Sequence, residues 1–226
     1  MAGFGEFDSL RFVAVIVTFI IAITVHEFMH AWTAWMLGDD TARLLGRVSL
    51  NPVVHFDPVG ALLFVLIALG LPGIAWGKPV PVNDFRLRPA SRFGRHGSMA
   101  LVAFAGPLSN VVLGAIAAGI WRLSLSAGVR LGEAERFLEI FVFVNFGLAA
   151  FNMIPLPPLD GSRILVALLP PFWRPVLAPL ERYGVPILIL LLISGRFLPF
   201  GRNIGSEIIR GISDPVLGLL LKIFVG

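Results

Sequence analysis

Two histidines and a glutamate lie together in a segment that is otherwise almost wholly apolar. They form the stretch HEFMH, residues 26–30, inside the apolar run from Leu10 to Leu37. At a rise of about 1.5 Å per residue, this run is long enough for a membrane-spanning helix. In such a helix His26 and His30 project from one face about one turn apart, so both imidazoles can reach a single metal ion. The spacing therefore predicts a metal site within an apolar helix.

Glu27 adds hydrolytic chemistry to this prediction. A carboxylate beside the first histidine would lie next to the open position of the metal, where it can take a proton from bound water. This is the HExxH pattern, whose mechanics are those of a zinc hydrolase. The alternative is a pair of membrane histidines that hydrogen-bond to neighbouring helices. Ionisable side chains in a spanning helix are costly, and this favours the functional interpretation.

The composition indicates an integral membrane protein with one domain, residues 1–226. The chain is 57% hydrophobic and 14% charged, and it has no long polar segment. The absence of cysteine excludes disulfides, thiolate zinc ligands and a cysteine nucleophile, so His, Asp or Glu must hold any metal. The net charge of +4 comes from basic residues beside apolar runs. These are typical of topology signals and lipid headgroup contacts, and nucleic acid is not an expected partner.

The apolar runs predict an all-α polytopic bundle of about five to six spans. The last run, residues 204–225, is either a span or an amphipathic surface helix, because charged residues interrupt it. Residues 44–50 alternate apolar and polar side chains and predict a short β-strand after the first span. The other apolar runs are 10–37, 59–76, 98–121, 137–154 and 183–200.

The distribution of basic residues predicts the orientation of the chain. The segment 77–97 carries five Lys and Arg against one acid, so we expect it to be cytoplasmic in a multi-pass protein of the plasma membrane. The ends of the 10–37 and 137–154 spans are expected on this same side, and so is the active site. Residues 59–76 then cannot cross the bilayer once, and the glycines and proline at 70–73 predict a re-entrant segment there.

A catalytic zinc needs a third protein ligand, for which the sequence offers three candidates. Glu139 lies early in the 137–154 run, Asp160 follows its end, and His55 lies in a loop. Asp160 is preferred because the proline- and glycine-rich residues before it cannot continue a helix, and irregular backbone at membrane depth must be covered or line a cavity. A lone loop histidine is more often structural, and the role of His55 stays open. Asp39 and Asp40 are expected to be solvated loop residues.

Three segments together resemble the signatures of the site-2 protease family of intramembrane zinc metalloproteases. They are HEFMH, AGPLSN at 105–110 and NMIPLPPLDG at 152–161, and LNPVVHFDPVG and GKPVPVN are similar to segments of the short family members. The resemblance covers roughly residues 18–165. It implies Zn²⁺ held by His26, His30 and Asp160, with Glu27 as general base and Asn152 near the scissile carbonyl. The PDZ and cystathionine-synthase-like domains of some branches are not expected, and this puts substrate selection by such a module in doubt.

The expected function is hydrolysis of peptide bonds in or near transmembrane segments of substrate proteins within the lipid bilayer. The strand predicted at 44–50 could hold an unwound substrate by edge pairing. The main alternative is a divalent-metal transporter or metal-binding membrane protein that uses the same His and Asp residues. An inactive, substrate-binding relative and a soluble-type protease with a Glu ligand are weaker alternatives. The sequence leaves the substrate, the cleavage position and the oligomeric state open.

Overall fold

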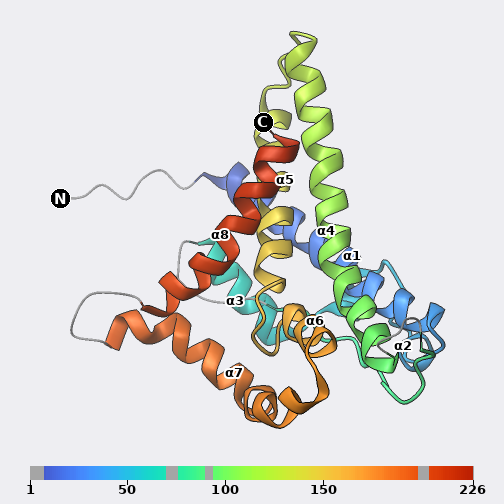
Figure 1. Cartoon of the computed structure of the whole chain (residues 1–226). Coiled ribbons are helices and arrows are strands. Elements are labelled where there is room, and N and C mark those ends of the chain that lie inside the picture. The colour runs from blue at the N-terminus through green and yellow to red at the C-terminus, as the bar shows by residue number, and fades with distance from the viewer. Residues whose placement is uncertain (1–7, 70–75, 90–93, 198–203, 226) are drawn as a thin grey trace.

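A computed structural model describes residues 8–69, 76–89, 94–197 and 204–225 of the chain. These residues form helices and connecting segments, with no strand among them, so the expected all-α class is confirmed (Figure 1). The helices are α1 (Ser9–Met36), α2 (Thr41–Leu44), α3 (Pro58–Ala68), α4 (Gly94–Ser126), α5 (Glu133–Asn152), α6 (Asp160–Leu168), α7 (Arg174–Phe197) and α8 (Ile204–Phe224), with 3₁₀ turns η1 (Pro52–His55) and η2 (Pro171–Trp173).

Helices α1, α4 and α5 pack against one another as the centre of the molecule (Figure 1). Helices α1 and α4 run antiparallel: Asn110 of α4 contacts Ala22 of α1, and residue 102 of α4 contacts His30. Small residues bring the helices close. A Cβ on Gly114 of α4 would collide with the Phe146 ring of α5, and the buried Ala117 and Ala118 extend the same contact. Close approach of small residues is how helices associate where no water is expelled.

Helix α6 returns to the α1–α4 pair at the end of α5. Residues 153–159 form a tight turn that includes a cis peptide bond between Pro157 and Pro158. Helix α6 then starts at Asp160, and its second residue is Gly161, where a Cβ would collide with the carbonyl groups of Met153 and Ile154. The glycine therefore lets the first turn of α6 lie directly on the end of α5. This contact fixes where the Asp160 side chain projects.

The strand predicted for residues 44–50 is wrong. Thr41–Leu44 is a single turn of helix, and it ends at Gly46, whose φ of +70° lies in the left-handed region. The amide of Gly46 donates to the carbonyl of Arg43, and that of Arg47 donates to the carbonyl of Ala42. This is the Schellman arrangement, in which a glycine just after a helix closes its last carbonyl groups. The alternating side chains belong to a short helix and a turn. Residues 44–50 therefore offer no strand edge with which an unwound substrate could pair.

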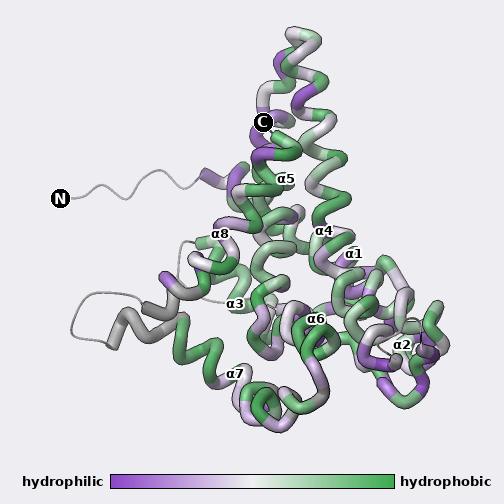
Figure 2. The backbone as a smooth tube through the Cα atoms, viewed as in Figure 1, coloured by the Kyte–Doolittle hydropathy of each residue, from purple (hydrophilic) through white to green (hydrophobic). Residues whose placement is uncertain are grey.

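Two helices are long and apolar enough to cross a membrane, α1 and α4, within the part of the chain that the structure describes. Apolar helices fit the expected membrane protein, but the larger span count is not confirmed. Helix α3 has 11 residues and is by itself too short to span, and the expectation that 59–76 does not cross the bilayer stays a prediction. The suspected re-entrant turn at 70–73 lies outside the described residues. Figure 2 shows apolar residues along the helices and hydrophilic residues gathered around α2.

The C-terminal helices α7 and α8 pack beside α5 and the turn that follows it. Helix α8 packs on both α5 and α7, and α7 lies against the turn that precedes α6 (Figure 1). A buried cluster joins these elements around Ile154, Leu159, Leu188 and Ile209. Helix α8 is not among the two candidate spans, so its expected role as a span or a surface helix stays open.

Candidate metal site

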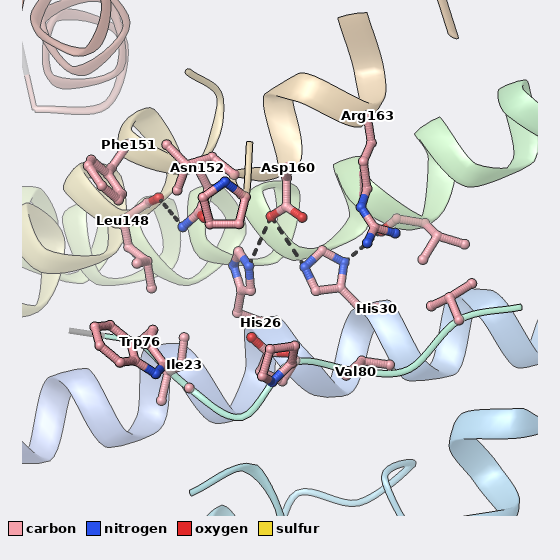
Figure 3. A pocket seen from close by; sticks show the side chains of 18 of the residues that line it. Ile23, His26, His30, Trp76, Val80, Leu148, Phe151, Asn152, Asp160 and Arg163 are labelled. Carbon is pink, nitrogen blue, oxygen red and sulfur yellow. Dashed lines mark hydrogen bonds and ion pairs between the residues drawn. The ribbon is translucent and has the colours of Figure 1, made fainter. Parts of the chain in front are cut away.

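The two histidines of HEFMH and Asp160 meet at one point in the structure. The Nε2 atom of His26 lies 3.2 Å from Asp160 Oδ2, and that of His30 lies 3.3 Å from the same oxygen. Both imidazoles are buried, with 3% and 7% of their residue surfaces exposed. Figure 3 shows the carboxylate pointing from α6 onto the two rings of α1. Segments 130 residues apart in sequence thus supply three possible ligand atoms, which lie within 4.8 Å of one another.

The far side of each imidazole is hydrogen-bonded to an acceptor. His30 Nδ1 lies 2.7 Å from the backbone carbonyl oxygen of Val102, and His26 Nδ1 lies 2.6 Å from Asn110 Oδ1. A carbonyl oxygen can only accept, so each Nδ1 carries the proton in the neutral ring. Each Nε2 then turns a lone pair toward Asp160. This tautomer is the one in which a histidine binds a metal through Nε2 while its other nitrogen is held by a second group.

These residues fit a zinc ion. Two lone pairs and a carboxylate oxygen face one another, and Asp160 Oδ2 is buried without a hydrogen-bond donor. Such a group of acceptors is favourable when a cation lies among them. Zinc bonds of about 2.0–2.2 Å to nitrogen and oxygen place tetrahedral ligand atoms about 3.4 Å apart, close to the two separations between the histidines and Asp160. The donor set of two histidines and one carboxylate also suits a catalytic zinc with one open position.

Gly106 of α4 provides the space for the two rings. A Cβ at this position would collide with His30 Nε2 and would lie 2.7 Å from His26 Nε2. The glycine therefore lets the backbone of α4 cover the metal-facing edges of both imidazoles. General helix packing would also explain a small residue in AGPLSN. At Gly106 there is an additional reason, because the imidazoles occupy the space that a side chain would need.

Glu27 faces a pocket of about 450 Å³ beside the three ligand atoms. It is 9% exposed, and it forms no ion pair with any described residue. The pocket is lined mainly by apolar side chains, and Asn152 also contributes to its wall (Figure 3). A carboxylate without a partner, next to a metal site and open to a cavity, can receive a proton from water in that cavity.

An extended segment, residues 76–83, runs along α1 past this pocket, and we call it the strap (Figure 3). The Arg47 guanidinium donates to the carbonyl oxygens of Lys78 and Pro79. The Lys78 amide donates in turn to the His55 carbonyl oxygen at 2.9 Å. A Cβ on Gly77 would lie 3.6 Å from Glu27 Oε1, so the strap passes directly beside the general-base candidate.

Arg47 and His55 form a buried basic pair behind the strap. They are 4% and 1% exposed, and Arg47 Nε and His55 Nδ1 have no hydrogen-bond partner. Burial lowers the pKa of His55 below its ordinary value, although the hydrogen bond from its Nε2 to the Ser49 carbonyl oxygen opposes this shift. Burial also lowers the pKa of Arg47, and the negative charge of Glu27 opposes it. Glu27 and the pair are therefore close enough to interact electrostatically.

The other sequence candidates are not part of the group of possible metal ligands. The Asn152 side chain lines the pocket, and its Nδ2 donates to the Leu148 carbonyl oxygen at 2.9 Å. Glu139 is exposed on α5 and is not part of the ligand group. His55 belongs to the strap side of the site, not to this group. Asp39 corrects the expectation of a solvated residue: it is fully buried and accepts a hydrogen bond of 2.6 Å from the Asn83 amide at the end of the strap.

Sequence reasoning missed three residues that surround the site. Asn110 and Gly106 belong to AGPLSN, which was recognised as a signature without a role for its members. Their position four residues apart on one face of a helix was the available signal. Arg47 carried no signal beyond being a basic residue near apolar spans, because its contacts are with backbone groups far away in sequence.

Comparisons with known proteins agree with the geometry. The model of "Peptidase family M50" matches residues 118–194, a range that includes Asp160. "Putative zinc metalloprotease YwhC" of Bacillus subtilis (strain 168) is 35% identical over 216 residues, covering 92% of this chain and 91% of the relative. "Putative zinc metalloprotease MJ0611" of Methanocaldococcus jannaschii is 41% identical over 191 residues, covering 84% of each chain.

A further relative is "Putative zinc metalloprotease Rip2" of Mycolicibacterium smegmatis, which is 30% identical over 184 residues, with 81% of this chain and 68% of the relative covered. No solved structure matches the chain. The resemblance seen in the sequence is thus confirmed by relatives that match most of this chain. The chain belongs to peptidase family M50, the site-2 protease family.

Proposed function

We propose that this chain, residues 1–226, is a single membrane-embedded zinc metalloendopeptidase that cleaves peptide bonds in or near transmembrane segments of other proteins. In this proposal His26, His30 and Asp160 hold the zinc, Glu27 is the general base, and Asn152 binds the substrate near the scissile bond. The names of the relatives support both the metal and the reaction class.

One observation carries the proposal. Two buried imidazole nitrogens from α1 and a carboxylate oxygen from α6 meet at one point, and they do so at the wall of a pocket that also contains Glu27, a carboxylate without an ion pair. A structural histidine pair would need neither the neighbouring carboxylate of Glu27 nor the cavity. A hydrolytic metal site needs the acceptors, the base and the cavity together, and this arrangement contains all three.

Zinc bound there would polarise a peptide carbonyl and lower the pKa of a water molecule. Glu27 accepts the proton of that water and later delivers it to the amine nitrogen of the leaving group. The Asn152 Nδ2 group has one hydrogen on the Leu148 carbonyl oxygen and a second that can donate to the substrate. The mainly apolar walls of the pocket limit the water around the site and suit an apolar peptide segment.

The substrate must be locally unwound before it is cut. In a transmembrane helix each peptide carbonyl accepts a hydrogen bond from the amide of residue i+4. Water then cannot attack the carbonyl carbon, and no polarising group can bind the carbonyl oxygen. The pocket lies between α1, α6 and the strap, so an extended peptide can enter along the strap. This supports a transmembrane protein as the partner in cleavage.

We further propose a multi-pass protein of the plasma membrane whose active site faces the cytoplasm. The contacts at the end of α1 support one side for both neighbouring loops. The Arg88 amide donates to the Leu37 carbonyl oxygen at 2.8 Å, and Arg86 pairs with Asp40 at 2.6 Å. A topology reporter inserted after Asp40 and another after Arg88 should therefore both score cytoplasmic. Opposite scores would contradict the arrangement.

The decisive experiment is Glu27→Gln in purified protein, with Asp160→Ala as its counterpart. Glu27→Gln should retain about one zinc per chain while its cleavage of a single-span reporter falls by about 10²–10⁴-fold, because the ligands remain and the base is lost. Asp160→Ala should lose both zinc and cleavage. Zinc content is measured by atomic emission, and cleavage by gel electrophoresis of the reporter.

The same pair of variants tests the transporter alternative. If Glu27 were a ligand or carrier in a metal transit site, Glu27→Gln would alter metal affinity or flux in proteoliposomes. A wild-type protein that binds zinc, moves it across vesicles and cleaves no reporter would refute the protease assignment.

A further inference from the structure

A chain of buried amides joins His26 to two other helices. Asn110 of α4 and Asn145 of α5 are both fully buried, and neither is used by the proposed reaction. Asn110 Oδ1 lies 2.6 Å from His26 Nδ1, and Asn110 Nδ2 lies 3.1 Å from both the Ala22 carbonyl oxygen and Asn145 Oδ1. Asn145 Nδ2 donates to the Phe141 carbonyl oxygen at 2.8 Å. The chain therefore runs from the backbone of α5 to the imidazole.

The direction of every bond in this chain is determined by its backbone ends. The Phe141 carbonyl can only accept, so Nδ2 of Asn145 must face it and Oδ1 must face Asn110. The Ala22 carbonyl and Asn145 Oδ1 are then two acceptors, so the amide group of Asn110 must donate to both. Only the oxygen of Asn110 is left for His26. A flipped amide at either residue would place two acceptors or two donors against each other.

The consequence falls on the imidazole of His26. An oxygen opposite Nδ1 requires the proton on Nδ1 and leaves the lone pair on Nε2, the atom that lies 3.2 Å from Asp160 Oδ2. His30 needs no comparable side chain, because the backbone carbonyl of Val102 performs the same role at 2.7 Å. The tautomer of one ligand is thus set by backbone, and that of the other by a side chain that mutation can remove.

We propose that Asn110, oriented by Asn145, is a positioning residue that fixes the Nδ1–H tautomer and ring orientation of His26 and thereby raises the affinity of the site for zinc. The inference rests on the proposed zinc site for its effect on affinity. Its effect on the tautomer stands on the hydrogen bonds alone. Groups that hold the far nitrogen of a ligating histidine typically change metal affinity by about 10- to 100-fold.

The test compares Asn110→Ala and Asn145→Ala with a matched control, Ser109→Ala. Ser109 is buried next to Asn110, but its hydroxyl donates to the Gly106 carbonyl of its own helix at 2.6 Å. Zinc affinity is measured by competition with a chelator. Asn110→Ala should weaken zinc binding about 10- to 100-fold, Asn145→Ala should weaken it several-fold, and Ser109→Ala should change it less than about twofold.

A second readout needs no metal. The chain has 4 histidines, so ¹⁵N imidazole spectra of the metal-free protein can be assigned by single substitutions. At alkaline pH wild-type His26 should show a protonated Nδ1 and a bare Nε2. Asn110→Ala should give a mixture of the two tautomers, whereas Ser109→Ala should keep the wild-type spectrum. Unchanged affinity or an unchanged tautomer in Asn110→Ala would overturn the proposal.

Asn110→Asp separates positioning from packing and also serves if the alanine variant does not fold. Its carboxylate keeps an acceptor for His26 Nδ1, but it loses the donors to Ala22 and Asn145. Positioning predicts wild-type tautomer and zinc affinity within about threefold, despite a lower unfolding temperature. Zinc affinity that instead falls in parallel with unfolding temperature would assign Asn110 a merely structural role. If wild-type protein binds no zinc, the proposed function fails, and the ¹⁵N spectra alone decide the role of Asn110.

Discussion

The two sides of helix α1 are built in opposite ways. On the side that faces α4 and α6, every nitrogen of the two imidazoles has an assigned neighbour, from Asn110 and Val102 behind to Asp160 in front. On the side that faces the strap, Arg47 Nε and His55 Nδ1 are buried without a partner, and Glu27 has no ion pair. On the first side the far nitrogen of each imidazole is held in place, whereas on the second the buried nitrogens of Arg47 and His55 retain unused hydrogen-bonding capacity.

This difference separates holding a metal from carrying out a reaction. A metal site gains affinity when its ligands are already oriented, because no reorganisation is then needed on binding. A catalytic base must exchange protons with water and substrate, so saturation of its surroundings would work against it. We expect changes on the α4 side to alter metal content, and changes on the strap side to alter turnover with metal retained.

The largest contrast is expected between two glycines, one on each side. Gly106→Ala places a Cβ against both imidazoles and should reduce zinc to below about 0.1 per chain, because the ligand rings cannot keep their positions. Gly77→Ala meets Ile23 at 3.0 Å and Glu27 at 3.6 Å, and these flexible side chains can yield. It should keep zinc and slow reporter cleavage by about tenfold or less. Equal zinc loss in both variants would remove the distinction between the sides.

A smaller effect is expected for Arg47. Arg47→Met removes the donors to the strap carbonyls and the positive charge near Glu27. The strap should lose its position, and kcat/KM for the reporter should fall about tenfold, which corresponds to the loss of about 1.4 kcal/mol expected for hydrogen bonds from a charged donor. Zinc content should stay at the wild-type level.

Arg47→Lys is the matched control for this prediction. It keeps the charge and one donor, but not the fork that reaches two carbonyl oxygens, so it should recover part of the activity. If Arg47→Met instead lost zinc, the strap side would have to be counted as part of the metal site.

Asp39 connects one end of the strap to the start of α2. It accepts from the Thr41 amide at 3.0 Å, the Thr41 hydroxyl at 2.5 Å and the Asn83 amide at 2.6 Å. Asp39→Asn should lower the free energy of unfolding by about 1–3 kcal/mol, because a buried charged acceptor is lost. Asp40→Asn should cost under about 1 kcal/mol, since its pairing with Arg86 is partly exposed. Thermal unfolding in detergent measures both, and an equal effect would contradict the burial of Asp39.

The smallest effect is expected from pH. Burial lowers the pKa of His55 in the folded protein below the ordinary value of 6.5. The unfolded chain then takes up a proton first as pH falls, so stability due to the neutral His55 is present above about pH 6.5 and declines below it. His55→Gln should flatten this part of the pH profile of unfolding temperature by a few degrees. A profile that stays as steep as wild type would show that His55 is not the responsible group.

Much of the chemistry was predictable from local sequence. HEFMH indicates two candidate ligands and a candidate base through helical periodicity, because residues i and i+4 share a face in any α-helix. Asp160 was predictable because proline and glycine end the preceding helix at a defined place. The prediction of a strand at 44–50 was wrong because it also rested on a local pattern. Alternation over a few residues does not distinguish a strand from a short helix that is followed by a left-handed glycine, here Gly46.

The remaining features depend on contacts between distant segments. The sequence by itself determined the residue types, the helix face that carries them and the membrane class, since these follow from periodicity and composition. Only the tertiary structure decided that Asp160 reaches both imidazoles, that Asn110 and Val102 lie against their Nδ1 atoms, and that Arg47 binds the strap beside Glu27. Hydrogen bonds to backbone carbonyls far along the chain leave no pattern in residue types, because every residue offers the same carbonyl group.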